Sequence, residues 1–118
     1  MLLCALQCSF IISCQDNDKN ISFHYKDSDN SYTMDARFGK SKTRKAERYM
    51  NEMIGRQNNL SFSNTETDAV FTLDDGSKFY MKKTPGHIKI SMNKDETSDQ
   101  TYHAVKQMCQ GMKDVILK

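Results

Sequence analysis

Hydrophobic and polar side chains alternate along residues 21–38. Ile21, Phe23 and Tyr25 are separated by polar residues, and a cluster of turn-forming residues follows at 27–30. The alternation then resumes with apolar side chains at Tyr32, Met34, Ala36 and Phe38. Because successive side chains of a strand point to opposite faces, the pattern predicts a β-hairpin with one apolar face.

Residues 41–55 change to a helical period. The apolar side chains recur three or four positions apart, at Ala46, Tyr49, Met50, Met53 and Ile54. Charged side chains occupy most of the remaining positions, which is typical of an amphipathic helix. Ser41 or Thr43 can cap the start of this helix, and Gly55 can end it.

Shorter alternating segments follow the first predicted helix. Leu60 and Phe62 predict a strand, and further apolar positions predict strands at 69–73, 78–83 and 88–92. The last three are separated by two sequences typical of tight turns, Asp74-Asp75-Gly76-Ser77 and Thr84-Pro85-Gly86-His87. These segments predict an antiparallel meander.

The chain ends in a second helical pattern over residues 98–117. Its apolar stripe consists of Tyr102, Val105, Cys109, Met112 and Ile116. Thr97 and Gln100 have the spacing of a capping box at the start of this helix.

The predicted order of elements along the chain is ββ-α-βββ-α, with one further strand optional in the second group of strands. It predicts an α+β two-layer sandwich over 21–118, in which two helices cover one face of an antiparallel sheet.

The first thirteen residues differ from the rest of the chain. Residues 1–13 carry no charge and include ten hydrophobic residues, whereas the following residues 14–20 are mainly polar. The apolar stretch is too short to serve as a permanent membrane-spanning anchor, and its length is that of the apolar part of a signal peptide. It lacks the basic residue that usually opens such a signal, since Lys19 is the first Lys or Arg. A conventional cleaved signal and an apolar element packed into the core are the alternative interpretations.

The junction Ile11-Ile12-Ser13-Cys14 resembles the lipobox of bacterial lipoproteins. In that pattern, two aliphatic or small residues are followed by Gly, Ala or Ser and then by an obligatory Cys. The resemblance implies that 1–13 is a lipoprotein signal peptide, that Cys14 is lipidated and that 14–20 is a flexible tether. It also implies a cell-envelope location, on the outer membrane or the cell surface, facing the periplasm or the exterior.

The distribution of the four cysteines agrees with this interpretation. Cys4, Cys8 and Cys14 lie near one end of the chain, and Cys109 is alone near the other. We therefore expect Cys109 to be a buried, unreactive thiol on the apolar face of the second helix. The sequence has no CxxC pair, which excludes a zinc ribbon.

Composition and motifs narrow the function further. The 118 residues carry a net charge of only +2, which disfavours a chain-wide polycation for nucleic acid. His24, His87 and His103 lack the spacing of a metal site, and the common nucleophile, zinc-protease and phosphate-loop motifs are missing from the sequence. We therefore expect no enzyme activity, no cofactor and no metal.

A cluster of basic residues is the strongest candidate binding site. The cluster consists of Arg37, Lys40, Lys42, Arg44, Lys45 and Arg48, opposed only by Glu47. It is interpreted either as a patch for nucleic acid, phospholipid headgroups or acidic glycan, or as the solvated face of a short helix. Lys78, Lys82, Lys83 and Lys89 form a second group, expected on exposed strand edges.

The distribution of charge disfavours nucleic acid as the partner. Residues 41–117 resemble double-stranded-RNA-binding domains in the order of their elements only. The second helix of those domains presents lysines to phosphates, whereas the helix predicted here begins beside Asp95, Glu96 and Asp99. The sequence thus predicts a membrane-anchored envelope lipoprotein with a non-catalytic binding or structural domain, whose partner is a protein or an anionic glycan. The alternative is an intracellular nucleic-acid-binding domain that uses the basic 37–48 segment.

Overall fold

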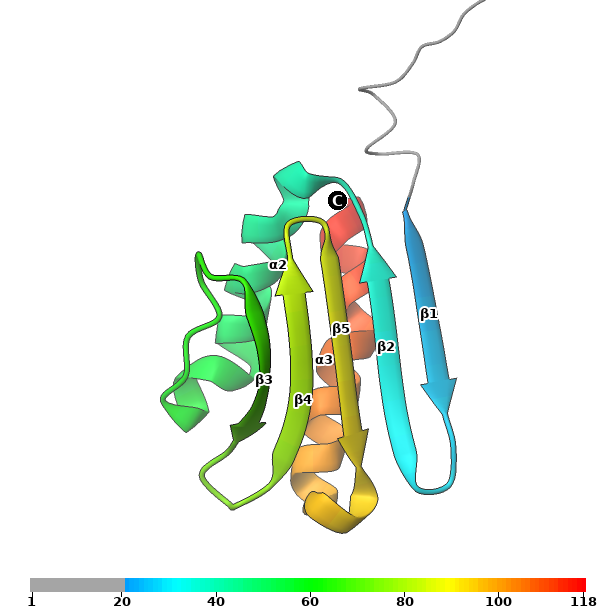
Figure 1. Ribbon diagram of the computed structural model, residues 1–118, viewed down its shortest axis with the longest axis vertical. Coiled ribbons are helices and arrows are strands. Elements are labelled where there is room, and N and C mark those ends of the chain that lie inside the picture. The colour runs from blue at the N-terminus through cyan, green and yellow to red at the C-terminus, as the bar shows by residue number, and fades with distance from the viewer. Residues whose placement is uncertain (1–20) are drawn as a thin grey trace, which may run out of the picture.

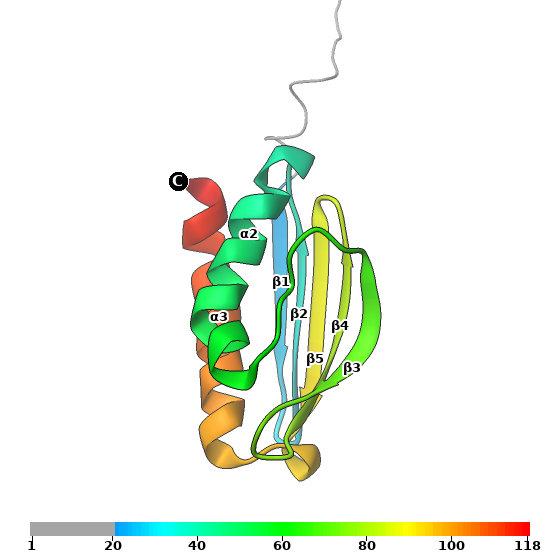
Figure 2. The ribbon, with the colours of Figure 1, turned by 90° about the vertical axis from the view of Figure 1, so that its left-hand side faces the viewer.

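The computed structural model describes residues 21–118, and the predicted signal peptide, Cys14 and the tether 14–20 lie outside the described residues. Five antiparallel strands form one sheet in the order β1-β2-β5-β4-β3 (Figure 1). The strands are β1 (Ser22–Asp27), β2 (Ser31–Arg37), β3 (Thr67–Thr72), β4 (Lys78–Thr84) and β5 (His87–Asn93). Two helices, α2 (Thr43–Met50) and α3 (Asp99–Leu117), pack on the same face of this sheet (Figure 2). The predicted α+β class and element order are confirmed.

Strand alternation separates a buried face of the sheet from an open one. On β2, β4 and β5 the helix-facing side chains are almost fully buried, and most are those predicted from the sequence. They are Tyr32, Met34, Ala36, Phe79, Met81, Lys83, Ile88, Ile90 and Met92. Among residues 21–118, no helix covers the opposite face, which carries mainly polar side chains, as an antiparallel sheet with one wet face requires (Figure 2).

The first helical segment is longer than its sequence pattern predicts. It opens with a 3₁₀ turn at Lys40–Lys42, continues beyond α2 as a π-helical turn (Asn51–Gly55), and ends in a 3₁₀ turn at Arg56–Asn58. Gly55 does not end the helix; Asn59 does, in the left-handed conformation with φ 60°. Thr43 does not cap the helix either, because its hydroxyl accepts a hydrogen bond from the Gly86 amide at 2.9 Å.

The predicted strand at Leu60 and Phe62 is wrong. This segment forms a loop in which the Leu60 amide donates to the Gly55 carbonyl at 2.8 Å and the Phe62 amide donates to Asn51 Oδ1 at 2.8 Å. Phe62 is nevertheless buried, with its ring centroid 5.3 Å from that of Phe71. The apolar alternation at Leu60 and Phe62 reflects the burial of a loop residue, Phe62. The backbone amides of this segment donate to the first helical segment and not to a neighbouring strand.

Helix α3 follows the predicted stripe, but its N-cap is Ser98 and not Thr97. The Ser98 hydroxyl accepts from the Thr101 amide at 3.1 Å. The predicted stripe is buried, together with Met108. The helix approaches α2 closely at Gly111, where an added Cβ would collide with the hydroxyl of Tyr49. That hydroxyl donates to the Met108 carbonyl at 2.9 Å, so a small residue at Gly111 allows the two helices to pack.

Candidate functional site at the basic end of the domain

The two ends of the sandwich collect different segments of the chain. At one end lie the start of β1, the end of β2, the β4–β5 turn, the start of the first helical segment and the end of α3 (Figure 1). Hydrogen bonds join these segments: the Phe38 amide donates to the Gly86 carbonyl at 2.9 Å, and Lys45 Nζ donates to the main-chain oxygen of Lys118 at 2.9 Å. At the other end, the Lys94 amide donates to the Asn30 carbonyl at 2.8 Å.

Charge is segregated between these ends. We call the first the basic end, because segments 37–45 and 113–118 supply seven Lys and Arg and one carboxylate, Asp114. The basic side chains are Arg37, Lys40, Lys42, Arg44, Lys45, Lys113 and Lys118. We call the second the acidic end, because segments 27–30, 74–77 and 94–99 supply seven carboxylates and one Lys. A nearly neutral chain therefore carries two oppositely charged ends.

The structure divides the predicted basic patch among three neighbourhoods. Arg37 lies at the end of β2 on the open face of the sheet, opposite Ser22 of β1. Lys42 and Lys45 turn to the end of α3, and both donate to the main-chain oxygen of Lys118. That position suits cations, since the carbonyl end of a helix carries partial negative charge.

The other three residues of the patch border two hollows beside α2. Lys40 and Arg44 line a cleft of about 370 Å³, which Glu66 also lines. Arg44 and Arg48 line a smaller neighbouring hollow with Asn64. Within residues 21–118, none of the six predicted patch residues forms an ion pair with a carboxylate. Five of the six residues belong to segment 37–45 at the basic end, and the sixth, Arg48, lies farther along α2.

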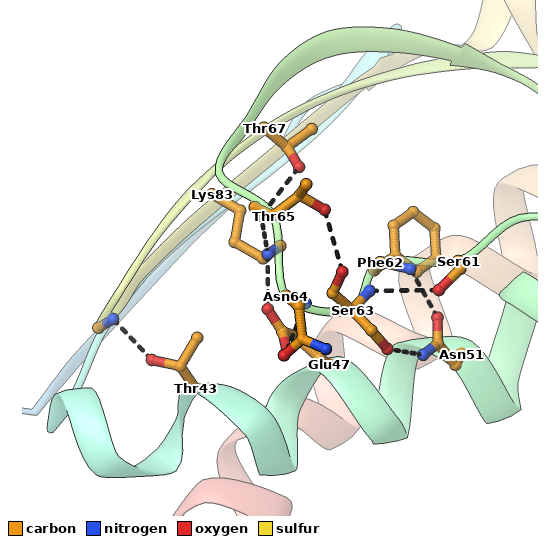
Figure 3. Close-up of polar contacts among 11 residues, drawn as sticks. Thr43, Glu47, Asn51, Ser61, Phe62, Ser63, Asn64, Thr65, Thr67 and Lys83 are labelled. Atoms are coloured by element: carbon orange, nitrogen blue, oxygen red, sulfur yellow. Dashed lines mark hydrogen bonds and ion pairs between the residues drawn. The ribbon is translucent and has the colours of Figure 1, made fainter.

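A buried ion pair forms the inner wall of the larger cleft. Lys83 Nζ lies 2.6 Å from Glu47 Oε2, and the two side chains are only 2% and 6% exposed. Figure 3 shows the two side chains pointing toward each other from β4 and α2. Lys83 also donates to the Thr65 carbonyl, and Glu47 Oε1 accepts from the Asn64 amide at 3.2 Å.

This pair corrects two expectations from the sequence. Glu47 was expected on the solvated face of the helix and Lys83 on an exposed strand, and both are buried. Lys83 is in phase with Phe79 and Met81 on β4, so its inward direction was visible in the alternation. Because both charges are paired and hydrogen-bonded, their role is to join α2, β4 and the loop that contains Thr65. The charged groups that line the cleft outside this pair are the Lys40 amine, the Arg44 guanidinium and the Glu66 carboxylate.

At the acidic end, the carboxylates take part in the fold. The Asp75 carboxylate accepts hydrogen bonds from the Ser98 and Thr101 hydroxyls, each at 2.6 Å, and from the Ser77 amide at 2.9 Å. These bonds, led by that from Ser98, hold the pKa of the Asp75 carboxyl well below its ordinary value. Asp27 pairs with Lys106 of α3. These contacts fasten the β3–β4 turn and the β1–β2 hairpin to α3.

The remaining candidate groups within residues 21–118 are one cysteine and three histidines. Burial raises the pKa of the Cys109 thiol to about 12, so it stays protonated, as an unreactive core thiol does. His24 and His103 are exposed, and His87 Nε2 lies 2.9 Å from Asp35 Oδ1 on the open face. Over residues 21–118, no three His, Cys, Asp or Glu side chains converge as a metal site would require. None of the helices described there has the length and apolar character needed to cross a bilayer.

Comparison of the chain with protein-family models, curated proteins and solved structures found no match.

Proposed function

We propose that this chain is a membrane-anchored envelope lipoprotein whose α+β domain is a non-catalytic binding module. The observation that carries the proposal is the sequence Ile11-Ile12-Ser13-Cys14, an uncharged leader ending in a small residue and a Cys, with a polar run directly after it. A thiol at this position is the group that a lipoprotein pathway converts to a lipid thioether. Acyl chains there stabilise membrane attachment by about 0.8 kcal/mol per buried methylene.

The described domain supports this arrangement at its first strand. β1 begins at Ser22 and is an edge strand of the sheet, so the described domain begins at the edge of the sheet and not in its centre. Cys109, the one Cys within residues 21–118, is buried and cannot be the lipidated thiol. Lipid on Cys14 would therefore leave the domain free to fold beside the membrane.

The charged side chains favour binding over catalysis. Arg37, Lys40 and Arg44 are exposed and form no ion pair with a described carboxylate. Free cations on a rigid support suit an anionic partner. Catalysis by a nucleophile or an acid–base pair would need activated groups, and the Cys109 thiol has the opposite property.

Membrane fractionation of two matched variants tests the proposal. In a bacterial host that processes lipoproteins, we expect the unaltered chain and Cys109→Ala in the membrane fraction after a wash in about 1 M salt, which screens surface charge. We expect Cys14→Ser to leave that fraction or to stay as an unprocessed precursor. Equal membrane retention and processing of all three chains would overturn the proposal. Recovery of the unaltered chain with bound nucleic acid and an intact leader would favour the intracellular alternative.

A further inference from the structure

The basic end carries charge that the fold does not use. Arg37, Lys40 and Arg44 have no hydrogen bond or ion pair from their side chains within residues 21–118. Like charges held together repel one another, so this cluster opposes folding unless an anion neutralises it. Among the nearby carboxylates, Glu47 is paired with Lys83 and Asp35 with His87, whereas Glu66 in the cleft and Asp114 on α3 have no such ion pair within residues 21–118. They leave the basic end positive overall.

The chain enters the domain at this same end. Ser22, the first residue of β1, is the cross-strand partner of Arg37. Residues 15–20 separate Cys14 from the described domain, and a fully extended chain from Cys14 to Ile21 spans at most about 25 Å. A lipid on Cys14 would thus keep the basic end within a few Debye lengths of the membrane surface, since that length is about 10 Å at 0.1 M salt.

We infer that the basic end faces an anionic phospholipid surface, which orients the tethered domain with its acidic end away from the membrane. The inference rests on the proposed lipidation of Cys14 and adds a partner and an orientation to it. Lys and Arg near an anionic bilayer strengthen attachment by about fivefold each. The carboxylates of segments 27–30, 74–77 and 94–99, at the opposite end, would be repelled by the same surface.

The shape and composition of the basic end favour a bilayer over a single anionic polymer. Its cations come from β2, from the start of the first helical segment and from the end of α3; Lys40 and Arg44 share a cleft, but the cations as a group do not line one groove. Leu117 is 53% exposed beside Lys118, and an apolar side chain among cations suits the headgroup boundary. The exposed large hydrophobics of residues 21–118 are Tyr25, Val70 and Leu117. At this end they supply no aromatic platform of the kind on which single-stranded bases stack.

Fluorescence quenching on the reconstituted lipoprotein tests the orientation. Full-length protein is expressed in a lipoprotein-processing host, and mass spectrometry establishes whether Cys14 carries lipid before it enters vesicles. A fluorophore is attached at Ser41→Cys on the basic end or at Asn30→Cys on the acidic end, both exposed. The vesicles contain a lipid with a quencher on its headgroup. In phosphatidylglycerol vesicles at low salt, we expect at least threefold stronger quenching at position 41 than at position 30. This ratio falls toward one in phosphatidylcholine vesicles or in about 1 M salt.

Matched charge variants separate orientation from simple attraction. The combined change Arg37→Gln, Lys40→Gln and Arg44→Gln should lower the ratio of oriented to unoriented molecules by on the order of a hundredfold and abolish the difference in quenching. The control, Lys78→Gln, Lys82→Gln and Lys89→Gln, removes the same charge from the open face of the sheet and should preserve the difference.

Three outcomes would overturn the inference. With lipid on Cys14, equal quenching of the two labels in phosphatidylglycerol at low salt excludes the orientation. The same loss of signal in both triple variants excludes the basic end as its cause. Tight binding of heparin or oligo(dT) that protects the label at position 41, without orientation on phosphatidylglycerol, would assign the end to a soluble polyanion. An unmodified Cys14 would instead overturn the proposed function, and the inference would fall with it.

Discussion

The two ends of this domain use their charged side chains in different ways. At the acidic end, Asp75 accepts three hydrogen bonds and Asp27 pairs with Lys106, so carboxylates hold turns against α3. At the basic end, Arg37 and Arg44 lie exposed without a carboxylate partner among the described residues. Charged side chains that form hydrogen bonds or ion pairs within the domain contribute to its stability. Charged side chains without such contacts are available to bind a partner. Stability and binding should therefore respond to substitutions at different ends.

The buried pair Glu47–Lys83 lies beside the basic end, in the cleft that Lys40 and Arg44 line, and its disruption should have the largest effect. Glu47→Ala or Lys83→Met alone leaves one charge buried without its partner, so we expect a loss of about 3–5 kcal/mol in the free energy of unfolding. Urea denaturation measures this loss.

A double variant separates the cost of an unpaired charge from the worth of the pair. Glu47→Leu combined with Lys83→Met should regain most of the loss, because an apolar pair of similar volume often replaces a buried ion pair without penalty. Glu52→Gln, an exposed position in the same helical segment, is the control and should change stability by less than about 0.5 kcal/mol. Single variants as stable as this control would show that the pair is not structural.

At the acidic end, loss of the Ser98 cap should have the next largest effect. Ser98→Ala removes the acceptor for the Thr101 amide at the start of α3, together with a donor to Asp75. We expect the free energy of unfolding to fall by about 1 kcal/mol. Gln100→Ala is the control, because Gln100 is exposed in the first turn of α3 and its side chain has no hydrogen bond within residues 21–118; an equal loss there would contradict the assignment of Ser98 as N-cap.

The hydrogen bonds to Asp75 predict a smaller, pH-dependent effect. Because the pKa of this carboxyl is lowered in the folded state, its contribution is complete above its ordinary value of 3.8 and is lost as the pH falls below that value. Asp75→Asn should therefore lower the Tm at neutral pH, and its difference from the unaltered protein should shrink below about pH 4. Thermal unfolding between about pH 2 and pH 7 measures both. A difference that stays constant with pH would argue against this role, and Asp74→Asn is the control.

The smallest effect on stability should come from the free charges of the basic end. Arg37→Gln, Lys40→Gln and Arg44→Gln should each change the free energy of unfolding by less than about 0.5 kcal/mol, or raise it slightly by relieving repulsion. Urea denaturation of the three variants checks this. A loss above about 2 kcal/mol in any of them would reveal a structural role that the contacts do not show.

Local patterns predicted most of the fold, and contacts between distant segments account for what they missed. Alternation and turn residues identified the five strands of residues 21–118, with the strand predicted at 69–73 overlapping β3, because each hairpin is specified by neighbours in the chain. The ion pair Glu47–Lys83 joins residues 36 positions apart, so no local pattern could pair them. Phe62 resembled a strand residue because burial in a loop and burial in a sheet leave the same apolar signal.

The candidate site was predicted only in part, for the same reason. The basic cluster 37–48 was visible as a run of Lys and Arg. Its position beside the entry of the chain depends on the pairing of Ser22 with Arg37, and its extension by Lys113 and Lys118 depends on the direction of α3. Neither follows from spacing along the sequence.

The mass of the N-terminal peptide of the mature protein, purified from membranes of a lipoprotein-processing host, shows whether Cys14 carries lipid. We predict a peptide that begins at Cys14 and carries the added mass of a diacylglycerol thioether. A peptide that retains residues 1–13, or one that begins at an unmodified Cys14, would contradict the claim that this domain is held at a membrane by lipid.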